Sequence, residues 1–118
     1  KILITDILLE KMEFDGVVIT DDMTMDAMNK NYNIGDAAVK AVLAGSDILL
    51  VCHDYKKLLE AINAVSEAVS DGRISEERLN ESVSRILKLK DKYRLADRAS
   101  AVADIDAINK KIDGLVTK

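Results

Sequence analysis

The chain has 118 residues, of which 48% are hydrophobic and 32% charged, and its formal net charge at pH 7 is −4. These values are typical of a folded globular domain, and they argue against the basic surface that binds nucleic acid. No apolar run reaches the roughly 20 residues that span a bilayer, and one cysteine excludes an internal disulfide and a thiolate metal cluster. We therefore expect no nucleic-acid partner, no membrane span, no metal and no cofactor.

The first half of the chain predicts two strands with helices around them. Apolar residues repeat at three and four positions over Lys1–Met12, which indicates an amphipathic helix. A β-branched apolar run over 16–20 predicts a buried strand, and 47–52 predicts a second one. A helix over 36–43, closed by Gly45 as a C-terminal cap, lies between them. The order strand, helix, strand predicts a βαβ unit with parallel strands.

Only helices are predicted after the second strand. An apolar stripe marks a helix over 55–70, and Ser75 is a good N-cap for a long amphipathic helix that follows. A further helix is expected over 101–116. The fold class is therefore α/β, with two parallel strands followed by C-terminal helices. Because such apolar strands normally have further strands beside them, we expect a fragment or a chain that completes its core by association.

Two adjacent carboxylates, Asp21 and Asp22, follow the first predicted strand. The carboxyl end of a parallel strand is where α/β folds and barrels place their active sites. Neighbouring side chains on a strand point to opposite faces, so at most one of the two acids acts and its partner comes from elsewhere. The alternative is that one caps the next helix and the other is solvated.

Cys52, His53 and Asp54 follow the second predicted strand and would lie at the same edge. Consecutive residues cannot align as a catalytic triad. We interpret them as a buried cysteine that ends the strand and a His–Asp pair that enters a helix. The methionines after the acids, at 23, 25 and 28, favour packing over ligand contact.

Residues 13–25 (EFDGVVITDDMTM) and 37–47 (AAVKAVLAGSD) resemble the late part of the catalytic domain of glycoside hydrolase family 3, in its bacterial β-N-acetylhexosaminidase branch. The shared signature is an apolar strand, Thr-Asp-Asp, a nearby Met and then Ala-Gly-Xaa-Asp before another strand. Residues 74–90 resemble the helices that close that domain. The resemblance implies that 1–95 are the C-terminal portion of a (β/α)8 barrel and contribute its last two strands. Residues 96–118 would be a helical tail or the start of a linker.

The resemblance also implies a chemistry. Asp21 matches the nucleophile of a retaining glycosidase, while Asp22 and Met25 match residues at the sugar site. The expected substrate is a β-linked N-acetylhexosaminide of cell-wall-type glycans, and no cofactor is needed. The acid/base of that branch is a His with an Asp partner on an upstream loop, which is missing here, so we expect the isolated chain to be inactive. No signal-peptide pattern is visible, and the compartment stays open.

Two other classes compete with this interpretation. Asp21, Asp22 and Asp54 could mimic the Mg²⁺-binding acids of a receiver-like phosphoacceptor domain, but such a domain needs five alternating strands and none is predicted after Asp54. A non-catalytic helical self-association module is the other alternative. Bare strand edges recruit other chains, which predicts a homo-oligomer.

Overall fold

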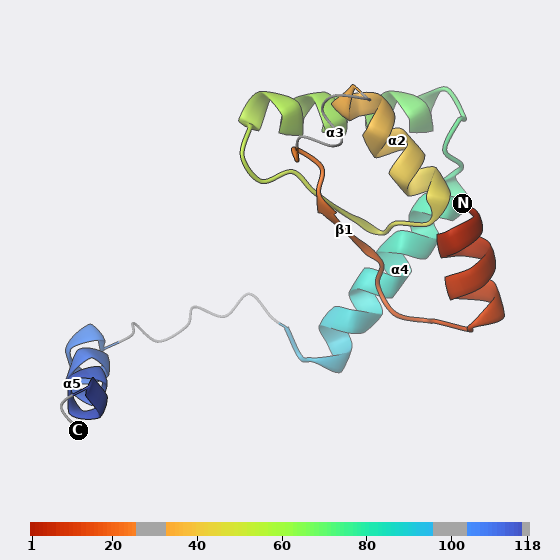
Figure 1. The fold of residues 1–118 in the computed structure, drawn as a ribbon. Coiled ribbons are helices and arrows are strands. Elements are labelled where there is room, and N and C mark those ends of the chain that lie inside the picture. The colour runs from red at the N-terminus through yellow and green to blue at the C-terminus, as the bar shows by residue number, and fades with distance from the viewer. Residues whose placement is uncertain (26–32, 96–103, 117–118) are drawn as a thin grey trace.

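The computed structural model describes residues 1–25, 33–95 and 104–116. Helices and strands follow one another in the expected order (Figure 1). Their bounds are η1 (Ile2–Lys11), β1 (Ile19–Asp22), α2 (Ile34–Ala44), β2 (Ile48–Leu50), α3 (Tyr55–Ser70), α4 (Glu76–Lys92) and α5 (Ile105–Val116). The predicted α/β class is confirmed as a mostly helical structure with two parallel strands. None of the described helices is long and apolar enough to cross a bilayer.

The two strands pair in parallel, as the βαβ prediction requires. Ile19 lies opposite Ile48, and Asp22 lies opposite Leu50, so β1 contains one residue more than β2 over the same stretch. The parallel pairing brings the carboxyl ends of both strands to the same edge of the sheet. An irregularity in the register therefore lies where β1 carries its acids.

Local capping determines where α2 begins and ends. The Asn33 side chain accepts hydrogen bonds from the backbone N–H groups of Gly35 and Asp36, so the helix starts at Ile34, two residues before the expected start. The predicted cap at Gly45 is confirmed, with a left-handed φ of 113°. A Cβ there would lie 2.8 Å from a methyl carbon of Ile4 in η1. Both the backbone conformation and the contact with η1 require glycine.

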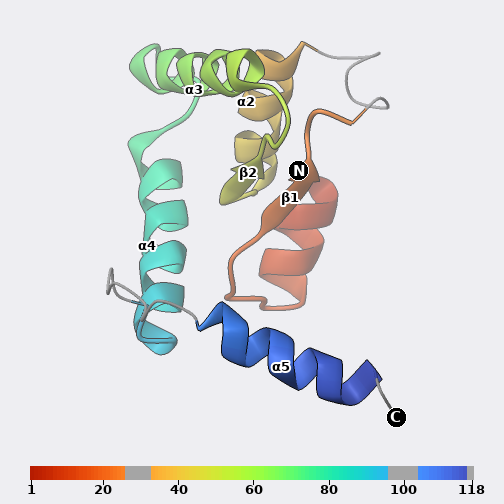
Figure 2. The ribbon, with the colours of Figure 1, turned by 90° about the vertical axis from the view of Figure 1, so that its left-hand side faces the viewer.

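The hydrophobic core lies where α2 and α3 pack on each other and on the strands (Figure 2). Alanines at the contact allow the two helices to approach closely. Two buried clusters result, one of Met23, Ile34, Ala37, Ala38 and Ala61 and the other of Val39, Val42, Ala68 and Ile74. The partly buried Leu49 of β2 packs against both clusters. The helices therefore hold the strands from one side.

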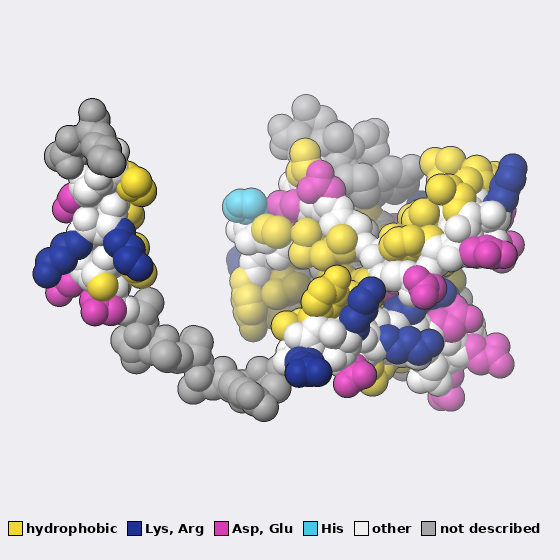
Figure 3. All heavy atoms as spheres, turned by 90° about the horizontal axis from the view of Figure 1, so that it is seen from below, with side chains coloured by type: hydrophobic (Ala, Val, Ile, Leu, Met, Phe, Trp, Pro, Cys, Tyr) yellow, Lys and Arg dark blue, Asp and Glu magenta, His cyan; other side chains and the backbone are white. Residues whose placement is uncertain are grey.

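Other parts of the chain make few contacts with this core. The predicted N-terminal helix is confirmed as η1, but it is wound as a π-helix and buries none of its residues. The α5 helix lies apart from the other elements (Figures 1 and 2). The radius of gyration is 19.2 Å, whereas a compact domain of this length has roughly 13 to 14 Å. Much apolar surface is therefore left open, as the hydrophobic side chains on the face shown in Figure 3 illustrate.

Two details of the strands differ from the sequence-based expectation. The sequence predicts the first strand over 16–20, whereas β1 begins at Ile19 and includes both acids. The Val18 amide donates to the Asp47 carboxylate instead of a backbone carbonyl, although the Val18 carbonyl accepts from the amides of Asp47 and Ile48. At the other end the Met23 amide donates to the Leu50 carbonyl, which extends the pairing. Cys52 was expected to be buried, but it is exposed because β2 ends two residues earlier.

Candidate active site

The acids at the end of β1 share one edge of the sheet with the residues that follow β2. Asp21 is exposed, and its Oδ1 accepts a hydrogen bond of 2.8 Å from the backbone N–H of Asp22. Asp22 is only 16% exposed in its side chain. The two neighbouring carboxylates therefore have different surroundings, as the alternation of side chains along a strand requires.

The irregular register explains how the acids are presented. The Leu50 amide donates to the Oγ1 of Thr20 at 3.0 Å, so a side-chain oxygen replaces a backbone carbonyl as the acceptor between the two strands. One residue more on β1 than on β2 is the defining feature of a β-bulge, which bends a strand and redirects a side chain. Here the result is that Asp21 lies in the open while Asp22 reaches toward the loop after β2.

Asp22 connects β1 to the loop after β2 through hydrogen bonds. Its Oδ1 accepts from the backbone N–H groups of Thr24 at 3.0 Å and Cys52 at 3.2 Å. Its Oδ2 accepts from the Thr24 hydroxyl at 2.7 Å and lies 2.9 Å from Nδ1 of His53. These bonds, led by those from Thr24, hold the pKa of Asp22 well below its usual range. The carboxylate is therefore charged and both of its oxygens have partners.

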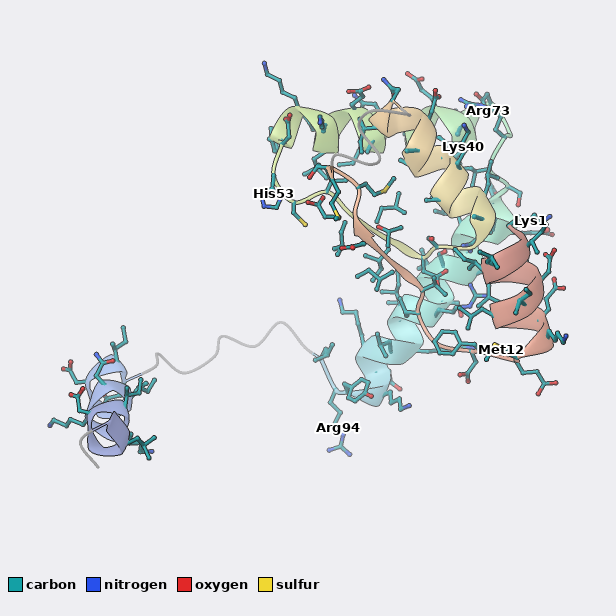
Figure 4. All side chains as sticks on the ribbon, viewed as in Figure 1. Lys1, Met12, Lys40, His53, Arg73 and Arg94 are labelled. Atoms are coloured by element: carbon teal, nitrogen blue, oxygen red, sulfur yellow. The ribbon has the colours of Figure 1, made fainter. Side chains whose placement is uncertain are left out.

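His53 extends this arrangement outward. A carboxylate only accepts hydrogen bonds, so Nδ1 carries the proton that faces Asp22. The rest of the ring is open, since the side chain is 81% exposed, and Figure 4 shows it at the edge of the molecule near the strand ends. Asp54 is instead the N-cap of α3, because its Oδ1 accepts from the backbone amides of Lys56 and Lys57. His53 and Asp54 are thus part of separate contacts and form no triad.

The methionines after the acids divide between core and surface. Met23 is 3% exposed and packs in the core, as expected, whereas Met25 is 52% exposed just beyond the acids. The third methionine of the sequence-based group, at position 28, lies outside the described residues. Among the described residues, no group of three or more His, Cys, Asp or Glu side chains could hold a metal ion.

A second polar cluster, which the sequence-based interpretation missed, lies at the opposite end of β2. Asp47 accepts from the Val18 amide, from the Ser82 hydroxyl at 2.6 Å and from Arg85 at 3.0 Å. Burial alone would raise the pKa of Asp47, but Ser82, Val18 and the charge of Arg85 together keep it below its usual value. Arg78, Ser82 and Arg85 are spaced by four and three residues on one face of α4, which is a signal that the sequence contained. This cluster lies at the amino end of β2, opposite to the candidate site, and its bonds connect the strand to α4.

These observations define the class of protein, an α/β domain built on a parallel βαβ unit. Its exposed carboxylate lies at the carboxyl ends of the strands, where α/β domains place their ligand sites. Residues 1–89 match the Glycosyl hydrolase family 3 N terminal domain, and the chain belongs to this family. The resemblance seen in the sequence is thereby confirmed.

The receiver-like alternative is wrong, because the described residues after Asp54 form only helices and turns and Asp54 itself is a helix cap.

Relatives of known structure or name agree with this assignment. A β-N-acetylglucosaminidase of this family from Paenibacillus sp. str. FPU-7 is 43% identical, with a TM-score of 0.76 over 82% of this chain and 19% of its own. The Beta-N-acetylglucosaminidase/beta-glucosidase of Cellulomonas fimi is 34% identical over 75% of this chain and 15% of its own. Beta-hexosaminidase A of Pseudoalteromonas piscicida is 27% identical over 86% and 18%. The chain thus spans less than a fifth of the length of each of these relatives.

Proposed function

We propose that this chain is the C-terminal portion of the catalytic barrel of a retaining glycoside hydrolase that releases β-linked N-acetylhexosamine from cell-wall-type glycans. The observation that carries the proposal is the difference between the two acids. Asp22 is engaged through both oxygens, while Asp21 is exposed at the carboxyl edge of β1. Family membership and the names of the relatives support the substrate class.

Asp21 acts as the nucleophile in this proposal. Its carboxylate attacks the anomeric carbon as the glycosidic bond breaks and the leaving oxygen takes a proton from the acid/base, which gives a covalent glycosyl–enzyme. Water that the same group deprotonates then hydrolyses this intermediate with net retention and frees Asp21. The hydrogen bond from the Asp22 amide holds Oδ1 of Asp21, which favours one orientation of the carboxylate for attack. The acid/base that assists both steps comes from a segment outside this chain.

Asp22 and Met25 belong to the sugar site in this proposal, in different ways. Met25 offers an exposed apolar side chain directly after the acids, and such side chains pack against the apolar face of a sugar ring. Asp22 contributes to the sugar site indirectly, because its hydrogen bonds to Cys52 and His53 fix the loop after β2. Residues 1–95 form the barrel portion, with β1 and β2 as its last two strands, and 96–118 are a tail or linker. The family match ends at residue 89, before α5 begins, which supports this division.

The test uses the protein with its complete barrel and an aryl β-N-acetylglucosaminide. Asp21→Ala should lower kcat by several orders of magnitude because the covalent route is lost. Asp22→Asn should cost less than Asp21→Asn, and the exposed Asp15→Asn serves as the control that leaves turnover unchanged. NMR of the first product should show the β anomer. An α anomer, or near-normal turnover of Asp21→Ala, would contradict the proposal.

A further inference from the structure

We propose that His53, oriented by Asp22, binds the sugar on the leaving-group side of the scissile bond. This inference rests on the proposed function, because it takes Asp21 as the nucleophile. It starts from an imidazole that is fixed at one nitrogen and open at the other. Nδ1 lies 2.9 Å from Oδ2 of Asp22, yet the side chain is 81% exposed.

The hydrogen bond to Asp22 determines what the ring offers to a ligand. Because Nδ1 donates to the carboxylate, Nε2 of the neutral ring is an acceptor, and a sugar hydroxyl is a matching donor. A ring held in one orientation loses less conformational freedom on binding than a free surface side chain does. Asp22 is itself held by Thr24 and by the Cys52 amide. The exposed imidazole is therefore held in one orientation in which it can bind a ligand.

The place of His53 on the sheet edge indicates which sugar it meets. The ring being transferred must lie with its anomeric carbon at Asp21, beside the end of β1. His53 belongs to the neighbouring loop, after β2, and Figure 4 shows its ring at the outer edge of the described residues, on a rim beyond the strand ends. A glycan that enters from solvent passes this rim with its second sugar. His53 therefore contacts the sugar that leaves, and Asp22, whose oxygens are occupied, acts on the substrate through His53.

The experiment compares two substrates of the protein with its complete barrel. One is a β-linked N-acetylglucosamine disaccharide, and the other is an aryl β-N-acetylglucosaminide, which has no second sugar. His53→Ala should raise KM for the disaccharide about three- to tenfold, the value of one hydrogen bond, with kcat nearly unchanged. KM for the aryl substrate should not change. His53→Gln, which keeps a hydrogen-bonding side chain, should recover part of the loss.

Lys56→Ala, an exposed change three residues further on, is the matched control and should leave both KM values unaltered. The melting temperature should not change in any of these variants. An equal rise of KM for both substrates, no rise for either, or a lower melting temperature of His53→Ala would overturn the inference. A wild-type protein that cleaves neither substrate would instead contradict the proposed function and this inference with it.

Discussion

Asp47 and Arg85 join the start of β2 to α4 through a salt bridge of 3.0 Å. The carboxylate is fully buried, and it also accepts from Ser82 and lies 3.4 Å from Arg78. Arg78 in turn donates to the backbone carbonyls of Val42 and Ser46 at the end of α2. One aspartate thus connects β2, α4 and the turn after α2, at the end of the sheet opposite to Asp21.

Asp47→Asn should therefore destabilise the fold. Removing one partner of a buried ion pair leaves uncompensated charge and typically costs 3 to 5 kcal/mol. The two arginine side chains are 16% and 20% exposed and recover some hydration, so we expect a loss of about 2 to 3 kcal/mol in the free energy of unfolding. Urea denaturation measures it. Asp71→Asn, which breaks the exposed pair with Arg73, is the control and should cost clearly less, because water screens an exposed ion pair. Equal losses would show that burial of Asp47 does not matter.

The same carboxylate should make stability depend on pH. The pKa of Asp47 is lower in the folded protein than in the unfolded chain, where it is close to 3.9. Between the two values the unfolded state binds more protons, so stability rises with pH there. The contribution of Asp47 is complete above its unfolded pKa and is lost as pH falls toward the folded one.

Urea midpoints measured from pH 6 down to pH 3 test this dependence. Asp47→Asn should give a shallower acid slope than wild type. Some slope should persist in the variant, because the pKa values of Asp22 and Asp71 are lowered as well. Parallel curves for the two proteins would show that Asp47 titrates alike in both states.

The sequence predicted local features of this structure well and tertiary contacts poorly. The helix over 55–70 and the caps at Ser75 and Gly45 were predicted because they depend on nearby residues. The bulge in β1 was missed, since it arises when the Thr20 hydroxyl meets a backbone amide 30 residues away. The contact between Asp22 and His53 was missed for the same reason. The alternation of the two acids was thus predictable from the strand itself, whereas the bonds that Cys52 and His53 make to Asp22 depend on the pairing of the two strands.

The 118-residue chain by itself should not hydrolyse glycosides. A general acid typically contributes about 10² to 10⁴-fold to the rate and substrate positioning adds more. In the proposed function both come from segments of the barrel outside this chain. The assay uses purified chain and an aryl β-N-acetylglucosaminide, with Asp21→Ala as the blank for contaminating activity. Turnover by the wild-type chain that disappears in Asp21→Ala would refute this expectation.

The isolated chain should also associate through its strands. A sheet of two strands has two edges, and unpaired backbone groups that lack water cost roughly 1 to 3 kcal/mol each. Ile19 of β1 is 54% exposed. An apolar groove of about 440 Å³ between β2 and α3, lined among others by Leu49, Val51 and Leu58, is open as well. Pairing with a second copy would cover one sheet edge of each chain and reduce the exposed apolar surface beside it.

Sedimentation measures the state of the isolated chain, and we expect species heavier than the 13.0 kDa monomer that grow with concentration. Ile19→Lys should weaken the association, because a lysine on an edge strand opposes pairing with another chain. Ile105→Lys changes an isoleucine in α5 that is even more exposed and is the control, since that helix lies apart from the strands. A monomer at every concentration, or equal weakening by both variants, would show that the strand edges do not drive association.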